Sequence, residues 1–190
     1  MKKNICVFCS SSDSLSMIYY EEARKLGKLI GLNKYNLIHG GGRIGIMGEV
    51  ARSVQKERGK VIGIIPVALK IKGVISETDD KIIITKDMNT RKAMMRKKAD
   101  VFIALPGGFG TLEEISEVIT LKQLKYHSKP IIFLNTGYFF NNLFKFYEDI
   151  YNQNFADHNF SNLYYIAKNP QDIFDYINKY DYTPFKDKYI

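Results

Sequence analysis

The sequence predicts an α/β fold with three layers, in which helices flank a central, mainly parallel β-sheet. Two features of the 190 residues predict it. Short apolar runs alternate with longer segments that carry apolar residues at helical spacing, a pattern typical of parallel sheets with helical crossovers. Glycine clusters at 40–48 and 107–110 each lie between an apolar run and a helical segment. Glycine-rich turns of this kind join strands to helices in α/β proteins.

Apolar runs define the candidate strands in order along the chain. Strands that are buried on both faces have continuous apolar sequences, and Val-Phe-Ile-Ala-Leu at 101–105 is such a run. The other candidates lie at 5–9, 36–39, 60–65, 82–85 and 131–134, with a less apolar one at 164–166. We expect these segments to form the sheet.

The segments between the strands predict six helices. The first, from 17 to about 32, places Tyr20, Ala23, Leu26 and Ile30 near one face. The others are expected at 46–58, 90–98, 112–125, 139–154 and 170–180, the last with a proline near its start, where helices tolerate it. The stretch 66–80 is the least regular and fits either a flap over a site or a crossover loop.

Length and composition favour one Rossmann-like domain at residues 1–180, followed by a polar tail at 181–190. A chain of this length buries a sizeable core. Its contents of 45% hydrophobic and 25% charged residues are ordinary for a globular protein. No apolar run approaches the ~20 residues that span a membrane, and the apolar part of the start is too short for a signal peptide. We therefore expect a cytoplasmic protein without a membrane partner.

Cysteine content and charge give little support for a metal site or a nucleic-acid partner. Cys6 and Cys9 have the spacing of a redox or zinc motif, but no second Cys or His pair lies nearby in the sequence. Residues three apart in a strand face opposite sides, so these thiols should diverge. The net charge of +8 is scattered along the chain, which suits solvated faces and small anionic ligands. We expect no metal, no cofactor and no nucleic acid.

The glycine clusters predict a phosphate-binding crevice. Ligands of parallel sheets bind outside the carboxyl ends of the strands. Glycine lets backbone N–H groups approach a phosphate, and a helix N-terminus adds free donors, so Gly41, Gly42 and Gly107 are candidate ligand contacts. Neither cluster has the Gly-Lys-Ser/Thr ending of a nucleoside triphosphatase loop. Glu114, just inside the second helix, should stay ionised because the helix dipole favours an anion.

Taken together, these motifs resemble the Lonely Guy (LOG) family of cytokinin riboside 5′-monophosphate phosphoribohydrolases, which were long mislabelled as lysine decarboxylases. The resemblance rests on Gly-Gly-Gly-Arg-Ile-Gly-Ile-Met-Gly at 40–48 and Pro-Gly-Gly-Phe-Gly-Thr-Leu-Glu-Glu at 106–114. Further matches lie at 6–12, 91–94, 117–120, 123–130 and 134–138. The likeness extends to about residue 180.

The resemblance implies a reaction and a set of site residues. Such enzymes hydrolyse the N-glycosidic bond of an adenine-type nucleoside 5′-monophosphate, a cytokinin nucleotide or AMP, to free base and ribose 5-phosphate, and a homodimer is implied. Arg91 and Glu114 match the catalytic pair. The positions that contact the ligand match Lys92, Gly108, Phe109, Gly110, Thr111 and Thr120. A carboxylate can stabilise the oxocarbenium-like charge on ribose, and an arginine, which keeps its proton, can hold the phosphate or orient the carboxylate.

Two departures from the family pattern concern recognition of the base. Asn89 stands where the family usually has histidine, and Gly73 stands where a ligand-contacting glutamate is common. Both changes leave the expected reaction class intact and the preferred base open.

Several alternatives accompany this interpretation. A non-catalytic nucleotide-binding or sensing module on the same fold is the main one, and retention of both Arg91 and Glu114 argues against it. A lysine decarboxylase would need a lysine that holds pyridoxal phosphate, which nothing in the sequence identifies. Glu117 shares a helical face with Glu114 and can be catalytic or structural, whereas His39 and His127 are expected to be structural.

Overall fold

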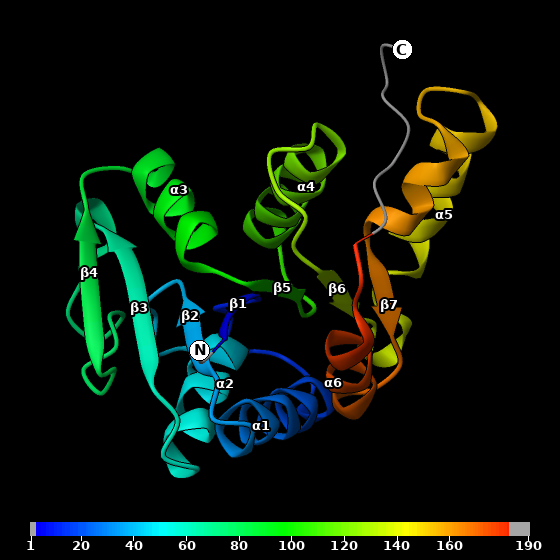
Figure 1. Cartoon of the computed structure of the whole chain (residues 1–190). Coiled ribbons are helices and arrows are strands. Elements are labelled where there is room, and N and C mark those ends of the chain that lie inside the picture. Colours follow the sequence, from blue (N-terminus) through cyan, green and yellow to red (C-terminus); the bar gives the residue numbers. More distant parts are fainter. Residues whose placement is uncertain (1–2, 183–190) are drawn as a thin grey trace.

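The computed structural model describes residues 3–182, which contain a seven-stranded parallel sheet (Figure 1). The strand order is β4-β3-β2-β1-β5-β6-β7, and every neighbouring pair runs parallel. The strands are β1 (Asn4–Phe8), β2 (Asn36–His39), β3 (Val61–Pro66), β4 (Lys81–Thr85), β5 (Val101–Ala104), β6 (Ile131–Leu134) and β7 (Tyr165–Ala167). Every strand predicted from the sequence is present, with ends that differ by one residue at most.

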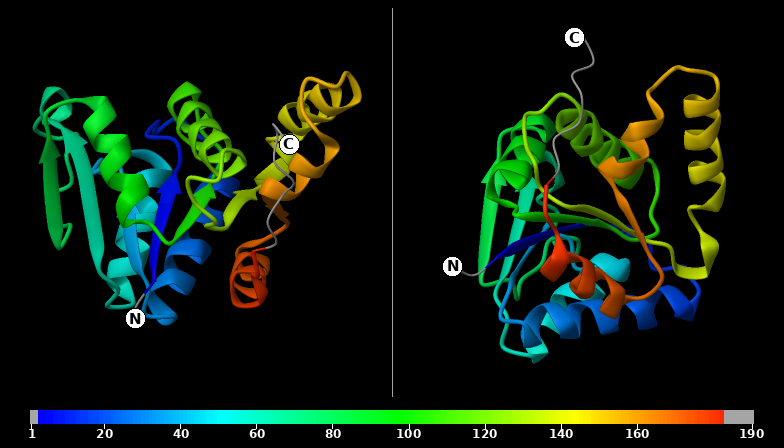
Figure 2. Two further views of the ribbon diagram at one scale, coloured as in Figure 1. Left: turned by 45° about the horizontal axis from the view of Figure 1, so that its top comes forward. Right: turned by 45° about the vertical axis from the view of Figure 1, so that its right-hand side comes forward.

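Six α-helices within the described residues cover the two faces of this sheet. They are α1 (Met17–Leu32), α2 (Gly45–Lys56), α3 (Met88–Lys98), α4 (Phe109–Gln123), α5 (Asn141–Asn152) and α6 (Pro170–Lys179). Helices α1, α2 and α6 lie on one face, and α3 and α4 lie on the other (Figures 1 and 2). The predicted three-layer α/β class is therefore confirmed.

The core explains why the strands have continuous apolar sequences. Along β5, Val101 and Ile103 pack with α1, α2 and α6, whereas Phe102 and Ala104 pack with α3, α4 and α5. Both faces of the sheet are therefore buried, so polar and apolar residues do not alternate along its central strands. The same geometry separates the two cysteines, because Cys6 lies in one core cluster and Cys9 in the other. Both are free, buried thiols.

The start of α4 differs from the prediction. The helix begins at Phe109 rather than at residue 112, with Gly108 in the extended conformation as its N-cap. Glycine has a low helix propensity, which is why the sequence placed 108–110 in a loop. The first turn tolerates glycine because its N–H groups have no intrahelical partners. As a result Glu114 is the sixth helical residue and lies in the second turn.

The irregular stretch 66–80 is tied to the first glycine cluster. After a single 3₁₀ turn (Val67–Leu69), the chain forms an isolated antiparallel bridge between Gly42 and Ile75. Two backbone hydrogen bonds flank it, from Arg43 to the Val74 carbonyl at 2.8 Å and from Ser76 to the Gly41 carbonyl at 2.8 Å. This segment therefore braces the loop that follows β2.

Three further findings complete the description. The 3₁₀ turns Thr136–Tyr138 and His158–Leu163 were not predicted. In the described part of the chain, no helix has both the length and the apolar character needed to cross a lipid bilayer. The predicted polar tail at 181–190 falls, from residue 183 onward, outside the described residues.

Candidate active site

The candidate site lies where the strand order reverses. Strands β1 and β5 are neighbours at the centre of the sheet, but the chain leaves β1 towards β2 and leaves β5 towards β6. The loops after these strands therefore open a crevice at the carboxyl edge. The Ser10 amide donates to the Pro106 carbonyl at 3.3 Å, and the Met47 amide donates to the Ser10 carbonyl at 3.2 Å. These contacts join the loops that follow β1, β2 and β5.

Arg91 and Glu114 meet at this crevice, as the resemblance implied. Arg91 comes from the first turn of α3 and Glu114 from α4, and their side chains are 8% and 10% exposed. The Arg91 guanidinium donates from Nη1 to Glu114 Oε1 at 2.6 Å and from Nε to the Ile64 carbonyl at 3.0 Å. Both side chains are therefore held in one orientation before any ligand binds.

The first glycine cluster provides the space that Arg91 occupies. A Cβ atom on Gly40 would overlap Nη2 of Arg91. Gly41 has a φ of +76°, which favours glycine, and its carbonyl accepts the hydrogen bond from Ser76. Of the three glycines, Gly40 is the one next to Arg91, whereas Gly41 packs against Ile65 and Gly42 against Met47. Close packing therefore explains the pattern at 40–42 as well as ligand approach does.

The second glycine cluster forms an open N-terminus on α4. A Cβ on Gly107 would overlap the Thr111 hydroxyl, so the loop folds tightly over that side chain. Cβ atoms on Gly108 and Gly110 would meet nothing within 4 Å, and Phe109 is 92% exposed. The amides of the first turn have no intrahelical partner and the dipole there is positive. This is the arrangement that binds a phosphate.

Burial dominates the electrostatics of Glu114. Desolvation raises the pKa of its carboxyl above the ordinary value, and the adjacent Arg91 guanidinium acts in the opposite direction. The helix dipole, on which the sequence-based expectation relied, has less influence at this position than at the start of α4. The dipole effect fades beyond the first turn, and Glu114 lies in the second.

Other predicted residues occupy different positions. Lys92 contacts Glu113 and lies 3.5 Å from Glu117, which also accepts from Arg96 Nη1 at 2.6 Å. Lys92 is thus beside the crevice, and Glu117 cross-links α3 to α4 in a structural role. Thr120 is exposed, and its hydroxyl donates to the Ser116 carbonyl at 2.9 Å. It lies nine residues beyond Thr111, or about 14 Å along the helix axis.

The structure also contains a buried polar group that the sequence analysis missed. Asp79 accepts hydrogen bonds from Ser76 Oγ at 2.6 Å and pairs with His39 Nε2 at 2.7 Å. This carboxylate is fully buried, and it fastens the stretch 66–80 to the end of β2. No local motif marks Asp79, because its partner is forty residues away.

His127 is structural, as expected. Its Nε2 donates to the Val118 carbonyl at 3.0 Å, and its Nδ1 accepts from the Lys129 amide at 3.2 Å. Burial lowers its pKa to about 4. The ring therefore stays neutral and connects the end of α4 to β6.

Comparisons with known proteins identify the relatives of this chain. The family model described as "Possible lysine decarboxylase" matches residues 47–177. The cytokinin riboside 5′-monophosphate phosphoribohydrolase LOG5 of Arabidopsis thaliana is 38% identical over 178 residues, which are 94% of this chain and 78% of that protein. The probable phosphoribohydrolase LOGL3 of Oryza sativa subsp. japonica is 38% identical over 98% of this chain and 87% of its own length.

Solved structures share the fold. The molybdenum cofactor binding protein of Rippkaea orientalis has a TM-score of 0.72 and 27% identity, over 94% of this chain and 96% of its own. The molybdenum cofactor carrier protein of Chlamydomonas reinhardtii has a TM-score of 0.73 and 22% identity, over 94% and 98% of the two chains. At 22% identity the latter shows the fold alone.

Proposed function

Because the chain belongs to the LOG family of cytokinin riboside 5′-monophosphate phosphoribohydrolases, we propose that it hydrolyses an adenine-type nucleoside 5′-monophosphate, a cytokinin nucleotide or AMP. The chain is a hydrolase that acts on N-glycosyl bonds. The products are the free base and ribose 5-phosphate. The observation that carries the proposal is the buried contact of Arg91 with Glu114 beside an open helix N-terminus.

The chemistry assigns a role to each part of the site. Cleavage of the bond to the base leaves positive charge on ribose, and the Glu114 carboxylate is positioned to stabilise it and to orient or deprotonate the attacking water. Arg91 holds that carboxylate. Backbone amides at Gly108–Thr111 and the Thr111 hydroxyl bind the phosphate. Lys92 lies close enough to the crevice to add positive charge, and the exposed Phe109 ring is available to cover the base.

A lysine decarboxylase does not fit these residues. Such an enzyme needs a lysine that binds pyridoxal phosphate in the crevice. Lys122 is buried, but it lies eight residues beyond Glu114 on α4, about 12 Å along the axis, and its ammonium donates to the Leu163 carbonyl at 2.8 Å. Lys92 is engaged by Glu113.

A non-catalytic carrier or sensing module is the second candidate, since solved proteins of this fold include cofactor carriers. A binding module gains nothing from a buried carboxylate that accepts a hydrogen bond from a buried arginine. Burial of such a pair is costly unless it serves a purpose. The hydrolase is therefore the better account of Arg91 and Glu114.

We further propose a homodimer in the cytoplasm. Thr120, which the resemblance assigns to the ligand, is too far along α4 from Thr111 to touch the same small molecule from its own chain. A second copy packed on the exposed side of α4 brings Thr120 to the ligand. Leu124, the C-cap residue of α4, and Phe146 on α5 are 43% and 59% exposed, which supplies apolar surface for such a contact.

The proposed cytoplasmic location is supported by the two free cysteines, which suit a reducing compartment.

The test is direct. The protein is incubated with AMP and with isopentenyladenosine monophosphate, and free base is followed by chromatography. Base is expected from at least one substrate, and Glu114→Gln is expected to reduce kcat by a factor of at least ~100 while ligand binding persists. Absence of base from these and other nucleoside monophosphates refutes the hydrolase. Full activity of Glu114→Gln removes that residue from its role.

A further inference from the structure

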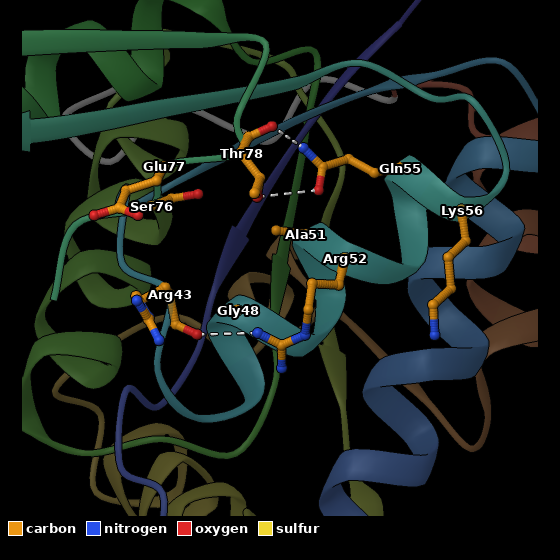
Figure 3. A pocket seen from close by; sticks show the side chains of 9 residues that line it. All are labelled: Arg43, Gly48, Ala51, Arg52, Gln55, Lys56, Ser76, Glu77 and Thr78. Carbon is orange, nitrogen blue, oxygen red and sulfur yellow. Dashed lines mark hydrogen bonds between the residues drawn. The ribbon is translucent and has the colours of Figure 1, made fainter. Parts of the chain in front are cut away.

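A second groove, of about 630 Å³, lies between α2 and the segment 76–78 (Figure 3). Its volume is that of a pocket for a small organic ligand. Ala51 has a small side chain, and Gly48 allows the Arg43 carbonyl to pack directly against α2. Helices α2 and α3 cover opposite faces of the sheet (Figure 1), so this groove is separate from the contact of Arg91 with Glu114.

Positive charge predominates in the lining of this groove. The lining includes three cationic residues, Arg43, Arg52 and Lys56, and a single carboxylate, Glu77. Within residues 3–182, neither Arg43 nor Lys56 makes an ion pair, and the same holds for Glu77. The groove therefore holds two cations without a counter-ion, in a place where a small anion fits.

Arg52 is held in a fixed position in the groove. Its guanidinium donates from Nη2 to Glu49 Oε2 at 2.7 Å and from Nη1 to the Arg43 carbonyl at 3.1 Å. Gln55 and Thr78 join the two sides of the groove by hydrogen bonds that Figure 3 shows. Arg52 is thus ordered by its contacts with the protein, and the exposed Arg43 side chain is the one that supplies donors to a ligand.

We propose that this groove binds a sugar phosphate. The planar guanidinium of Arg43 matches the oxygens of a phosphate monoester, and Arg52 adds charge next to it. The Glu77 carboxylate would repel a bare phosphate, but it accepts hydrogen bonds from the hydroxyl groups of a sugar. The phosphate is bound at the arginines and the sugar hydroxyls at Glu77. This proposal does not rest on the hydrolase activity, because Arg43, Arg52 and Glu77 are not among the residues that are given a role in the reaction.

The test uses isothermal titration with inorganic phosphate and with glucose 6-phosphate, on the full chain. Wild type is expected to bind glucose 6-phosphate more tightly than phosphate. Arg43→Gln should weaken both by at least ~tenfold, the effect of a lost charge-assisted hydrogen bond. Glu77→Gln should lower the affinity ratio of glucose 6-phosphate to phosphate, because it removes the repulsion of phosphate and replaces a charged acceptor of the sugar hydroxyls by a weaker, neutral one.

Two controls distinguish the groove from other anion sites. Arg24 also pairs with Glu49, at 2.8 Å, but does not line the groove, so Arg24→Gln should bind as wild type does. Thr111→Val alters the loop at α4 and should leave this binding in place. The proposal is overturned if wild type binds neither probe, if Arg43→Gln binds like wild type, or if Thr111→Val abolishes the binding.

Discussion

Replacement of Gly40 by alanine tests how far the reaction depends on the position of Arg91. The new Cβ would overlap Nη2 of Arg91 and lie 3.2 Å from Cε of Met47. Because the overlap is with the end of a flexible side chain, the guanidinium can retreat by about 1 Å to an ordinary contact distance. That shift breaks the 2.6 Å hydrogen bond to Glu114. A charge-assisted hydrogen bond contributes about 1.5–3 kcal/mol, so kcat is expected to fall about 10- to 150-fold.

The assay compares kcat for release of free base with the midpoint of thermal unfolding. Gly40→Ala should lose activity while Tm changes by less than ~3 °C, about 1 kcal/mol for a chain of this size. Gly27→Ala is the matched control, because its Cβ would lie 2.6 Å from the Val50 carbonyl and 2.6 Å from Ser53 Cβ. It should lower Tm by more and leave kcat unchanged. Activity of Gly40→Ala within threefold of wild type would refute the role given to Arg91.

Three further predictions concern pH and substrate. Burial raises the pKa of Glu114, so kcat/KM should fall with decreasing pH around a midpoint above the ordinary value of about 4.3; a midpoint at or below that value contradicts the assignment. Burial lowers the pKa of Lys122 to about 8, so the folded chain binds fewer protons than the unfolded chain between pH 8 and about 10.4. The free energy of unfolding in urea should therefore rise over this interval in wild type but not in Lys122→Met. Adenosine, which lacks the phosphate, should react with a kcat/KM at least ~100-fold below that of AMP, and equal values would remove the α4 N-terminus from binding.

Most of the fold could be predicted from the sequence because the apolar pattern of each segment agrees with its place in the folded protein. The runs that became strands are apolar on both sides, as Val101 and Phe102 illustrate by packing into different cores. Such runs have one stable environment, the centre of a layered sheet. Where local propensity and tertiary context disagreed, the predicted boundary was wrong. At α4, Gly108 has a low helix propensity but is the N-cap, so the helix begins earlier than predicted.

The resemblance pointed to two candidate catalytic residues, but nothing in the sequence indicated how deeply they are buried. A resemblance in residues identified Arg91 and Glu114, and the structure brings them into contact. Their degree of burial depends on how α3 and α4 pack, which no pattern in a single segment reveals. For the same reason the pairing of His39 with Asp79 could not be foreseen, since it joins β2 to a stretch without regular structure.

Helix α4 connects the two halves of the proposed chemistry in one rigid element. In the proposed mechanism its first amides bind the phosphate, and its sixth residue, Glu114, carries the carboxylate that acts on ribose. The separation of Gly110 from Glu114 along the axis is about 6 Å, which is comparable to the span of a ribose between its phosphate and its base. A rigid helix fixes this separation without a closing motion, so part of the entropy of alignment is removed before the substrate arrives. Arg91 then restricts the rotation of the Glu114 carboxylate, which the helix alone does not fix. Gly40 has no side chain, and this leaves the space that the Arg91 guanidinium occupies.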